Sequence, residues 1–151
     1  MADSSAVVSN RQARRDYFIF ETFEAGIALK GSEIKSIRKG RANLKDSFAR
    51  LEKKGVFLYN MHINPYEFAR REELDPKRPR KLLLRKSEIR HLIGKTFIKG
   101  ATLIPLRIYF KGSLAKVEIG LAKGKNLYDK RETIKKRAAK REIDRALHKR
   151  R

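Results

Sequence analysis

The chain has 151 residues, enough for one domain with an appendage, and its 39 Lys or Arg against 17 Asp or Glu give a formal net charge of +22. The absence of cysteine excludes disulfides, thiolate catalysis and cysteine-based zinc sites. No segment approaches 18 consecutive apolar residues, so the sequence predicts no membrane-spanning helix, and the charge surplus predicts nucleic acid as a partner, with a merely solvated charged surface as the alternative.

The N-terminal part of the chain predicts a lead, an arm, a strand and a helix. Residues 1–9 have an early acid and no long apolar run, so we expect a disordered lead without a signal peptide and a cytoplasmic location. Residues 10–15 form a short basic arm. Aromatic and β-branched residues over 17–29 predict a strand with a bend near Gly26. Residues 32–40 have an acid in the first turn, bases in the last turn and a final glycine, which predicts a short helix.

The middle of the chain predicts a hairpin, a loop and a second helix. Residues 48–52 and 56–63 flank a glycine-containing turn, which is typical of a β-hairpin. Residues 70–81 carry two prolines and many charges and are expected to form an exposed loop. The next helix is predicted to begin after Ser87 as its N-cap and to stop at Gly94. Its inward-facing aliphatic side chains are expected to be Ile89, Leu92 and Ile93.

A second hairpin is predicted near the end of the domain. Apolar residues alternate along one face of its first strand, at Thr102, Ile104, Leu106, Ile108 and Phe110. The returning strand, 114–121, places Val117 and Ile119 on one face and Lys116 and Glu118 on the other. The sum is a mainly β fold, and a sheet of this size avoids exposed edges by closing into a small antiparallel barrel. An open sheet decorated with helices is the alternative.

The last 29 residues form the most basic segment, with thirteen Lys or Arg and four acids. Such a segment cannot build a core, and its charges repel one another, so we expect it to be disordered when free. A capping-box spacing from Asp129 to Glu132 and a thin apolar stripe predict a helix that forms on contact with a polyanion. The chain therefore divides into a lead (1–9), a nucleic-acid-binding barrel (10–124) and a basic tail (125–151).

No motif in the sequence predicts catalysis, a metal or a cofactor. The three histidines, His62, His91 and His148, lack the spacing of metal ligands. The segment 120–126 has too few residues between its glycines for a phosphate loop of an NTPase, and it has Asn126 where such a loop has Ser or Thr. Its glycines beside lysines still suit close approach to an RNA phosphate. Tyr17 and Tyr66 border basic segments and are candidates for stacking on bases.

Many segments of the chain, in order, match one known family. They are Asn10-Arg11-x-Ala13-Arg14-x-Asp16-Tyr17, Phe23-Glu24-Ala25-Gly26-Ile27-Ala28-Leu29, Gly31-x-Glu33-Ile34-Lys35-Ser36-Ile37-Arg38-x-Gly40, Asp46-Ser47, Pro65-Tyr66-Glu67, Arg80-Lys81-Leu82-Leu83-Leu84, Leu106-x-x-Tyr109-Phe110-Lys111, Gly120-Leu121-Ala122-Lys123-Gly124-Lys125 and Asp129-Lys130-Arg131. With these segments the chain resembles the SsrA-binding (tmRNA-binding) protein family, also called small protein B, over nearly its whole length from residue 10.

The resemblance implies an oligonucleotide-binding (OB) type of barrel with two or three short flanking helices and a translation factor without catalytic activity, cofactor or metal. Its implied partners are the tRNA-like domain of tmRNA, the stalled 70S ribosome with its 16S rRNA, and, through tmRNA, elongation factor Tu and alanyl-tRNA synthetase. The tail would fold as a helix in the vacant mRNA channel. The expected tmRNA-binding residues are Glu24, Arg38, Arg80, Lys81, Leu83, Arg85, Lys123, Gly124 and Lys125. The expected ribosome and decoding-centre contacts are Arg15, Tyr17, Tyr128, Asp129, Lys130, Arg131, Lys135, Lys136, Arg137, Lys140 and Arg141.

Three positions depart from the family pattern. Relatives often have His at the position of Arg15, Asn or His at Arg85, and a second Lys at Asn126; the last departure removes one phosphate contact. Three other functions stay open on the residues alone. They are a generic OB-type binder of single-stranded RNA, a ribosomal protein, and a nuclease, the last disfavoured by the lack of an acidic metal cluster or a paired histidine site.

Overall fold

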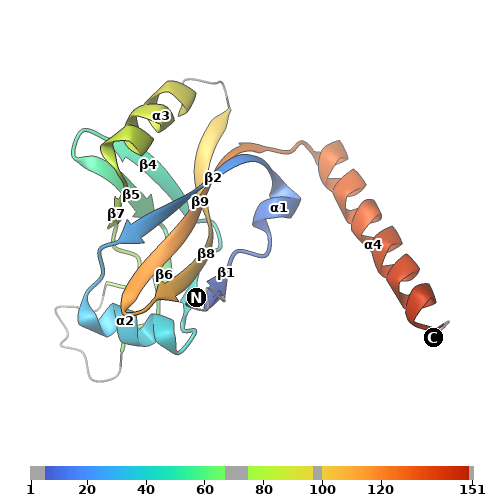
Figure 1. The fold of residues 1–151 in the computed structure, drawn as a ribbon, viewed down its shortest axis with the longest axis horizontal. Coiled ribbons are helices and arrows are strands. Elements are labelled where there is room, and N and C mark those ends of the chain that lie inside the picture. The colour runs from blue at the N-terminus through green and yellow to red at the C-terminus, as the bar shows by residue number, and fades with distance from the viewer. Residues whose placement is uncertain (1–5, 67–74, 97–99, 150–151) are drawn as a thin grey trace.

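A computed structural model describes residues 6–66, 75–96 and 100–149 (Figure 1). Most of these residues lie in β-strands, with short helices between them and one long helix at the C-terminus. In chain order the elements are β1 (Val8–Ser9), α1 (Ala13–Asp16), β2 (Tyr17–Ile27), α2 (Gly31–Arg38), β3 (Ala42–Asn43), β4 (Phe48–Glu52), β5 (Gly55–Tyr59), β6 (His62–Ile63), β7 (Arg80–Leu83), α3 (Lys86–Thr96), β8 (Ala101–Lys111), β9 (Leu114–Gly124) and α4 (Leu127–Lys149).

The main sheet closes on itself. Its strands follow the order β1-β8-β4-β5-β7-β2-β9, every pairing is antiparallel, and β9 also pairs with β8. Six strands therefore form a closed ring, with β1 added to β8 outside it. The seam between β4 and β8 is the shortest, with the single pair Ala49 and Leu103. The predicted antiparallel barrel is confirmed, and the open sheet is excluded because closure pairs the strands that would otherwise be edges.

The barrel encloses one main hydrophobic core, and helices cover its two ends. Leu58, Ile108 and Val117 are fully buried inside it. Figure 1 shows α3 at one end and α2 at the other, and each contributes a fully buried side chain to this core, Leu92 and Ile37 respectively. Burial of each such side chain contributes about 1.5–3 kcal/mol, so the helices stabilise the barrel by closing it to water.

A β-bulge in β8 corrects the predicted alternation of its side chains. The pairing of β8 with β9 shifts by one residue between Pro105 and Arg107. Ile108 therefore faces the main core, whereas Ile104 and Leu106 pack in a second cluster with Ala13 of α1. A shift of one residue moves side chains to the opposite face of a sheet, so the prediction that Thr102, Ile104, Leu106, Ile108 and Phe110 share one face is wrong.

The predicted ends of two further elements also differ from the structure. The helix α3 begins at Lys86 rather than after Ser87, and it runs through Gly94, whose φ is not positive. Ile93 is 45% exposed and does not face inward. The predicted strand over 56–63 is interrupted at Asn60, whose φ of 62° lies in the left-handed region. Tertiary packing of Leu92 extends the helix beyond a glycine that costs only about 1 kcal/mol.

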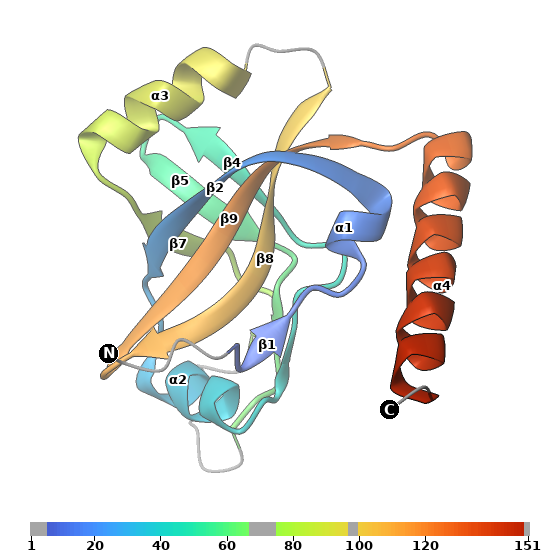
Figure 2. The same cartoon turned by 45° about the vertical axis from the view of Figure 1, so that its right-hand side comes forward.

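The lead and the tail helix that were predicted at the two ends of the chain compare differently with the structure. The lead predicted over 1–9 is too long, because Val8 and Ser9 pair with β8 and Val8 is buried. At the other end, the predicted tail helix is present as α4, which projects away from the barrel beyond α1 (Figure 2). Its disorder in the free protein stays a prediction. The loop predicted over 70–81 lies partly outside the described residues, and it ends earlier than predicted because β7 begins at Arg80.

Candidate nucleic-acid interface

A depression on the outside of the barrel brings together predicted RNA contacts from two distant segments and a lysine from a third. Its lining comes from β2, β9, the end of β7 and the start of α3, and consists of Glu24, Leu83, Leu84, Arg85, Glu88 and Lys116. Strand register explains the assembly, because Gly26 of β2 pairs with Leu83 on one side and with Lys116 on the other. Leu83 is 55% exposed, so it presents an apolar surface to a partner. Glu24, Leu83 and Arg85, all predicted from the sequence, thus lie at one place.

Lys116 is the cation of this depression that the predicted RNA contacts omit, and Leu84 and Glu88 of the lining are omitted as well. The alternation along the returning strand already placed it on the outer face with Glu118, and both side chains are half-exposed in the structure. What the sequence does not show is that β9 lies next to β2, which puts Lys116 opposite Gly26. An ammonium at this point is suited to a phosphate contact beside the exposed leucine.

Glu24 places an ionised acceptor at the edge of the depression. Its carboxylate accepts hydrogen bonds from the Lys111 ammonium, at 3.0 Å from Oε1, and from the Tyr109 hydroxyl at Oε2. The hydrogen bond from Lys111, followed by that from Tyr109, lowers the pKa of Glu24 below 4.5. A carboxylate repels phosphates but accepts hydrogen bonds from base amino groups and from the ribose 2′-hydroxyl, so Glu24 suits recognition of a base or a sugar.

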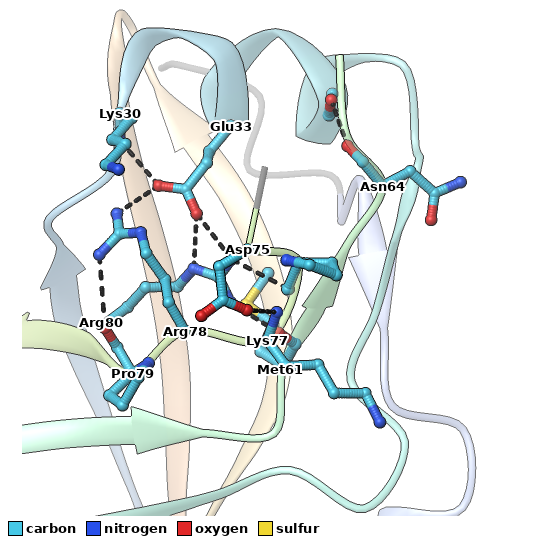
Figure 3. A network of polar contacts seen from close by, with 11 residues as sticks. Lys30, Glu33, Met61, Asn64, Asp75, Lys77, Arg78, Pro79 and Arg80 are labelled. Carbon is cyan, nitrogen blue, oxygen red and sulfur yellow. Dashed lines mark hydrogen bonds and ion pairs between the residues drawn. The ribbon is translucent and has the colours of Figure 1, made fainter. Parts of the chain in front are cut away.

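Arg80 must be removed from the predicted RNA contacts, because it is fully buried, and Figure 3 shows its polar contacts with neighbouring residues. Its Nε lies 2.8 Å from Oε2 of Glu33, and its two terminal nitrogens donate to the carbonyl oxygens of Met61 and Pro76. Arg78 donates to the other carboxylate oxygen of Glu33. A cation that would lie on the surface of a basic loop is thus inside the protein, where its role is to hold β7 and the segment before it against α2.

The same carboxylate also caps α2. Glu33 is the third residue of this helix, and its Oε1 accepts a hydrogen bond of 2.9 Å from the backbone N–H of Lys30. Burial raises the pKa of Glu33, but the hydrogen bonds from Lys30, Arg78 and Arg80 outweigh burial and leave the pKa below 4.5. Glu33 is therefore a buried anion that joins a helix start to β7, the strand that carries Lys81 and Leu83.

Two more predicted tmRNA contacts lie apart from the depression lining. Lys81 is an exposed residue of β7, whereas Arg38 lies on α2 with its guanidinium 4.3 Å from the centroid of the Phe110 ring. Such a contact holds the Arg38 side chain over the ring and leaves its N–H groups able to donate.

A second depression lies where the barrel meets the tail. It is lined by residues of α1, of the end of the β2–β9 pair where β2 begins and β9 finishes, and of the start of α4. Among them are Asn10, Asp16, Tyr17, Gly124, Lys125 and Lys130. The Lys125 ammonium lies 3.0 Å from the carbonyl oxygen of Arg14 and 2.7 Å from Oγ1 of Thr133, and Lys130 lies 3.6 Å from Asp16. Lys125 therefore connects α1 to α4 in this structure, whereas Lys123 is exposed.

The tail helix α4 exposes its charges on all sides. Most of the predicted ribosome contacts on this helix are exposed. They are Arg131, Lys135, Lys136, Arg137, Lys140 and Arg141. Its apolar residues are also exposed, with Ile134 at 51%, Ile143 at 60% and Leu147 at 58%. The side chains of Tyr128 and Asp129 lie outside the described part of the chain. On the neighbouring α1, Arg15 is paired with Asp16 at 3.3 Å.

The described residues contain no group of three or more His, Cys, Asp or Glu suited to a metal ion. Likewise, within ranges 6–66, 75–96 and 100–149, no helix has the length and apolar character needed to cross a bilayer. His91 on α3 is exposed, and its Nε2 lies 2.8 Å from Glu21; His62 lies in β6.

Comparison with known proteins places these features in one family. The family model for the SmpB protein matches residues 7–149. The chain is 62% identical over 141 residues to the SsrA-binding protein of Carboxydothermus hydrogenoformans, covering 93% of this chain and 95% of the relative. It is 57% identical over 148 residues to the SsrA-binding protein of Geobacillus thermodenitrificans, covering 98% and 96%. A solved chain described as "tmRNA-SmpB: a journey to the center of the bacterial ribosome" is 51% identical, with a TM-score of 0.67, and the match covers 83% of this chain and 92% of that one.

Proposed function

Because the chain belongs to the SmpB family, we propose that it binds tmRNA and acts in trans-translation, bringing this RNA to stalled ribosomes. The family is one of RNA-binding proteins rather than enzymes. The observation that carries the proposal for this chain is the depression in which an exposed leucine, a fixed carboxylate and two cations meet, from three strands and the segment that joins β7 to α3. That arrangement combines apolar, acceptor and phosphate contacts, as recognition of a folded RNA requires.

The barrel and the tail have separate roles in this proposal. Glu24, Leu83, Arg85 and Lys116 contact the tRNA-like domain of tmRNA, and Lys81, Arg38 and the strand end at Lys123 and Gly124 add phosphate contacts around them. The tail enters the vacant mRNA channel and neutralises its charges on 16S rRNA, with Arg15 and Tyr17 beside the decoding region. Elongation factor Tu and alanyl-tRNA synthetase meet the protein through tmRNA, and the cytoplasm is where these reactions occur.

A comparison of two RNAs of equal length tests the RNA-binding part. We expect the full chain to bind a tRNA-like domain transcript about tenfold or more tighter than poly-U, a difference of about 1.4 kcal/mol or more. Filter binding or fluorescence anisotropy at 0.15 M salt measures both affinities. Equal affinities would instead favour the generic OB-type binder of single strands. A ribosomal protein would sediment with all ribosomes, whereas this protein is expected only with those that carry tmRNA.

The strand end offers a second prediction about phosphate contacts. Lys123 is exposed, so Lys123→Ala is expected to lower the slope of log affinity against log salt concentration by about 1. Lys125→Ala is expected to lower this slope by less, because its ammonium is already held by Arg14 and Thr133. Titrations of the tRNA-like transcript over a series of salt concentrations measure both slopes. Equal decreases would return Lys125 to the phosphate contacts, which was our prediction from the sequence.

A further inference from the structure

An acid at the edge of a proposed RNA-binding surface needs an explanation. The side chain of Glu24 is 38% exposed and borders the depression that Arg85 and Lys116 also line. Its charge opposes the approach of phosphates, so the carboxylate favours binding only where it accepts a hydrogen bond from the RNA. An exposed glutamate samples several rotamers, and fixing one such side chain on binding costs about 0.5–1.5 kcal/mol.

The structure holds this carboxylate before any RNA arrives. The Tyr109 hydroxyl donates to its Oε2, and the Lys111 ammonium lies 2.8 Å from the same oxygen and 3.0 Å from Oε1. Tyr109 is only 3% exposed and has a rigid side chain, whereas the Lys111 side chain is 50% exposed and flexible. The lysine therefore supplies charge, and the tyrosine supplies direction.

Tyr109 is itself held in position by Arg107 of the same strand, β8, which is anchored in turn to β9. The guanidinium of Arg107 lies 4.6 Å from the centroid of the Tyr109 ring, and its Nε lies 2.5 Å from Oε2 of Glu118. Burial and the hydrogen bond to Glu24 both raise the pKa of Tyr109, so its hydroxyl keeps its proton and remains a donor. A chain of contacts thus runs from β9 through β8 to the carboxylate on β2.

We propose that Tyr109 is a positioning residue for RNA recognition: its hydroxyl orients the Glu24 carboxylate so that the remaining lone pairs accept a hydrogen bond from a base N–H or a ribose 2′-hydroxyl. This inference rests on the proposed function, because it concerns how the same surface distinguishes its RNA. It assigns a role to a buried side chain that contacts no RNA. It also explains why an acid is compatible with this basic surface, since Lys111 offsets its charge at long range while the acceptor stays available at short range.

A substitution that removes one hydroxyl tests the proposal. Tyr109→Phe keeps the ring and its contact with Arg107, and we expect it to weaken binding of the tRNA-like transcript by about tenfold through loss of the charge-assisted hydrogen bond. The matched control is Tyr59→Phe, which removes the same kind of hydrogen bond, to Glu52 on the β4–β5 hairpin, and is expected to leave affinity unchanged. Urea unfolding of both variants shows whether the fold is retained.

A double-mutant cycle distinguishes positioning from a general structural effect. If Tyr109 acts through Glu24, then Glu24→Gln weakens binding and Tyr109→Phe has little further effect in that background. Additive losses, or a Tyr109→Phe variant that binds as tightly as the unchanged protein or more tightly, overturn the proposal. These outcomes concern only the role of Tyr109. The proposed function itself would be contradicted if the unchanged protein did not prefer the tRNA-like transcript over poly-U.

Discussion

Replacing Glu33 with glutamine is expected to lower the free energy of unfolding by about 3–5 kcal/mol, the penalty for removing one partner of a buried ion pair. The substitution leaves the guanidinium of Arg80 fully buried without its ion-pair partner and removes the ion pair to Arg78. A domain of this size has only about 5–15 kcal/mol of stability in total, so the loss is a large part of it. Urea-induced unfolding followed by circular dichroism measures it.

The matched control for this substitution is Glu88→Gln. Glu88 occupies the corresponding position of α3, where its Oε1 accepts from the backbone N–H of Arg85 at 3.4 Å, but it has no buried arginine beside it. We expect this control to cost about 1 kcal/mol or less, as a cap alone does. Similar losses for the two variants would mean that capping, and not the buried pair, explains the role of Glu33.

The penalty at Glu33 also has a predictable pH dependence. Its folded-state pKa is lowered, so the carboxylate contributes stability above its unfolded-state pKa and loses that contribution as the pH falls through the folded-state pKa. The difference between the unchanged protein and Glu33→Gln should therefore be largest near neutral pH and should decrease below 4.5. Unfolding curves at a series of pH values measure the decrease, and a constant difference would contradict it.

Removing residues 127–151 is expected to abolish tag transfer on stalled ribosomes while the barrel still binds tmRNA. The deleted segment carries eleven Lys or Arg against four acids and includes all of α4, so the ribosome-bound state would lose the charges that we propose to be neutralised in the mRNA channel. In vitro translation of a message without a stop codon measures tagging, and an anisotropy titration measures tmRNA binding. Unimpaired tagging by the deleted form would contradict a role of the tail.

Two variants separate the charge of the tail from its helical form. Ala139 lies in the middle of α4 and is exposed. Ala139→Pro therefore keeps every charge of the tail and costs about 3 kcal/mol of helix stability. Ala139→Gln is the control, since glutamine supports a helix and fills the same position. If the helix is the bound form, the proline variant loses tagging and the glutamine variant keeps it. Equal activity of the two variants would show that charge alone suffices.

Local patterns predicted the elements well where the signal lies within a few residues. The helix α2, the hairpin of β4 and β5, and the strands β8 and β9 all lie close to their predicted positions, because caps, turns and alternation act between near neighbours. The alternation failed at Pro105, where a single extra residue reverses the faces. Pro105 is a local signal for such an irregularity, because proline within a sheet is confined to edges and bulges, but only the structure shows that Ile104 and Leu106 then pack with Ala13 of α1.

In the candidate site, too, some residues were predicted from the sequence and others were identified only by the structure. Glu24, Leu83 and Arg85 were predicted from the resemblance to a family, and the structure places them in one depression. Lys116 was missed, although its outward face was predicted, because the pairing of β9 with β2 joins segments about 90 residues apart. Arg80 was expected to contact RNA from the same resemblance, yet its side chain is buried.

The sequence alone determined the charge of this protein and its family, since composition and short motifs can be read without knowing which residues meet in space. Only the tertiary structure decided which side chains meet. The pairing of β9 with both β8 and β2 places Tyr109 beside Glu24, and the packing of α2 against β7 places Arg80 beside Glu33. Contacts between residues 47 and 85 positions apart depend on the packing of the whole barrel, which no local pattern contains.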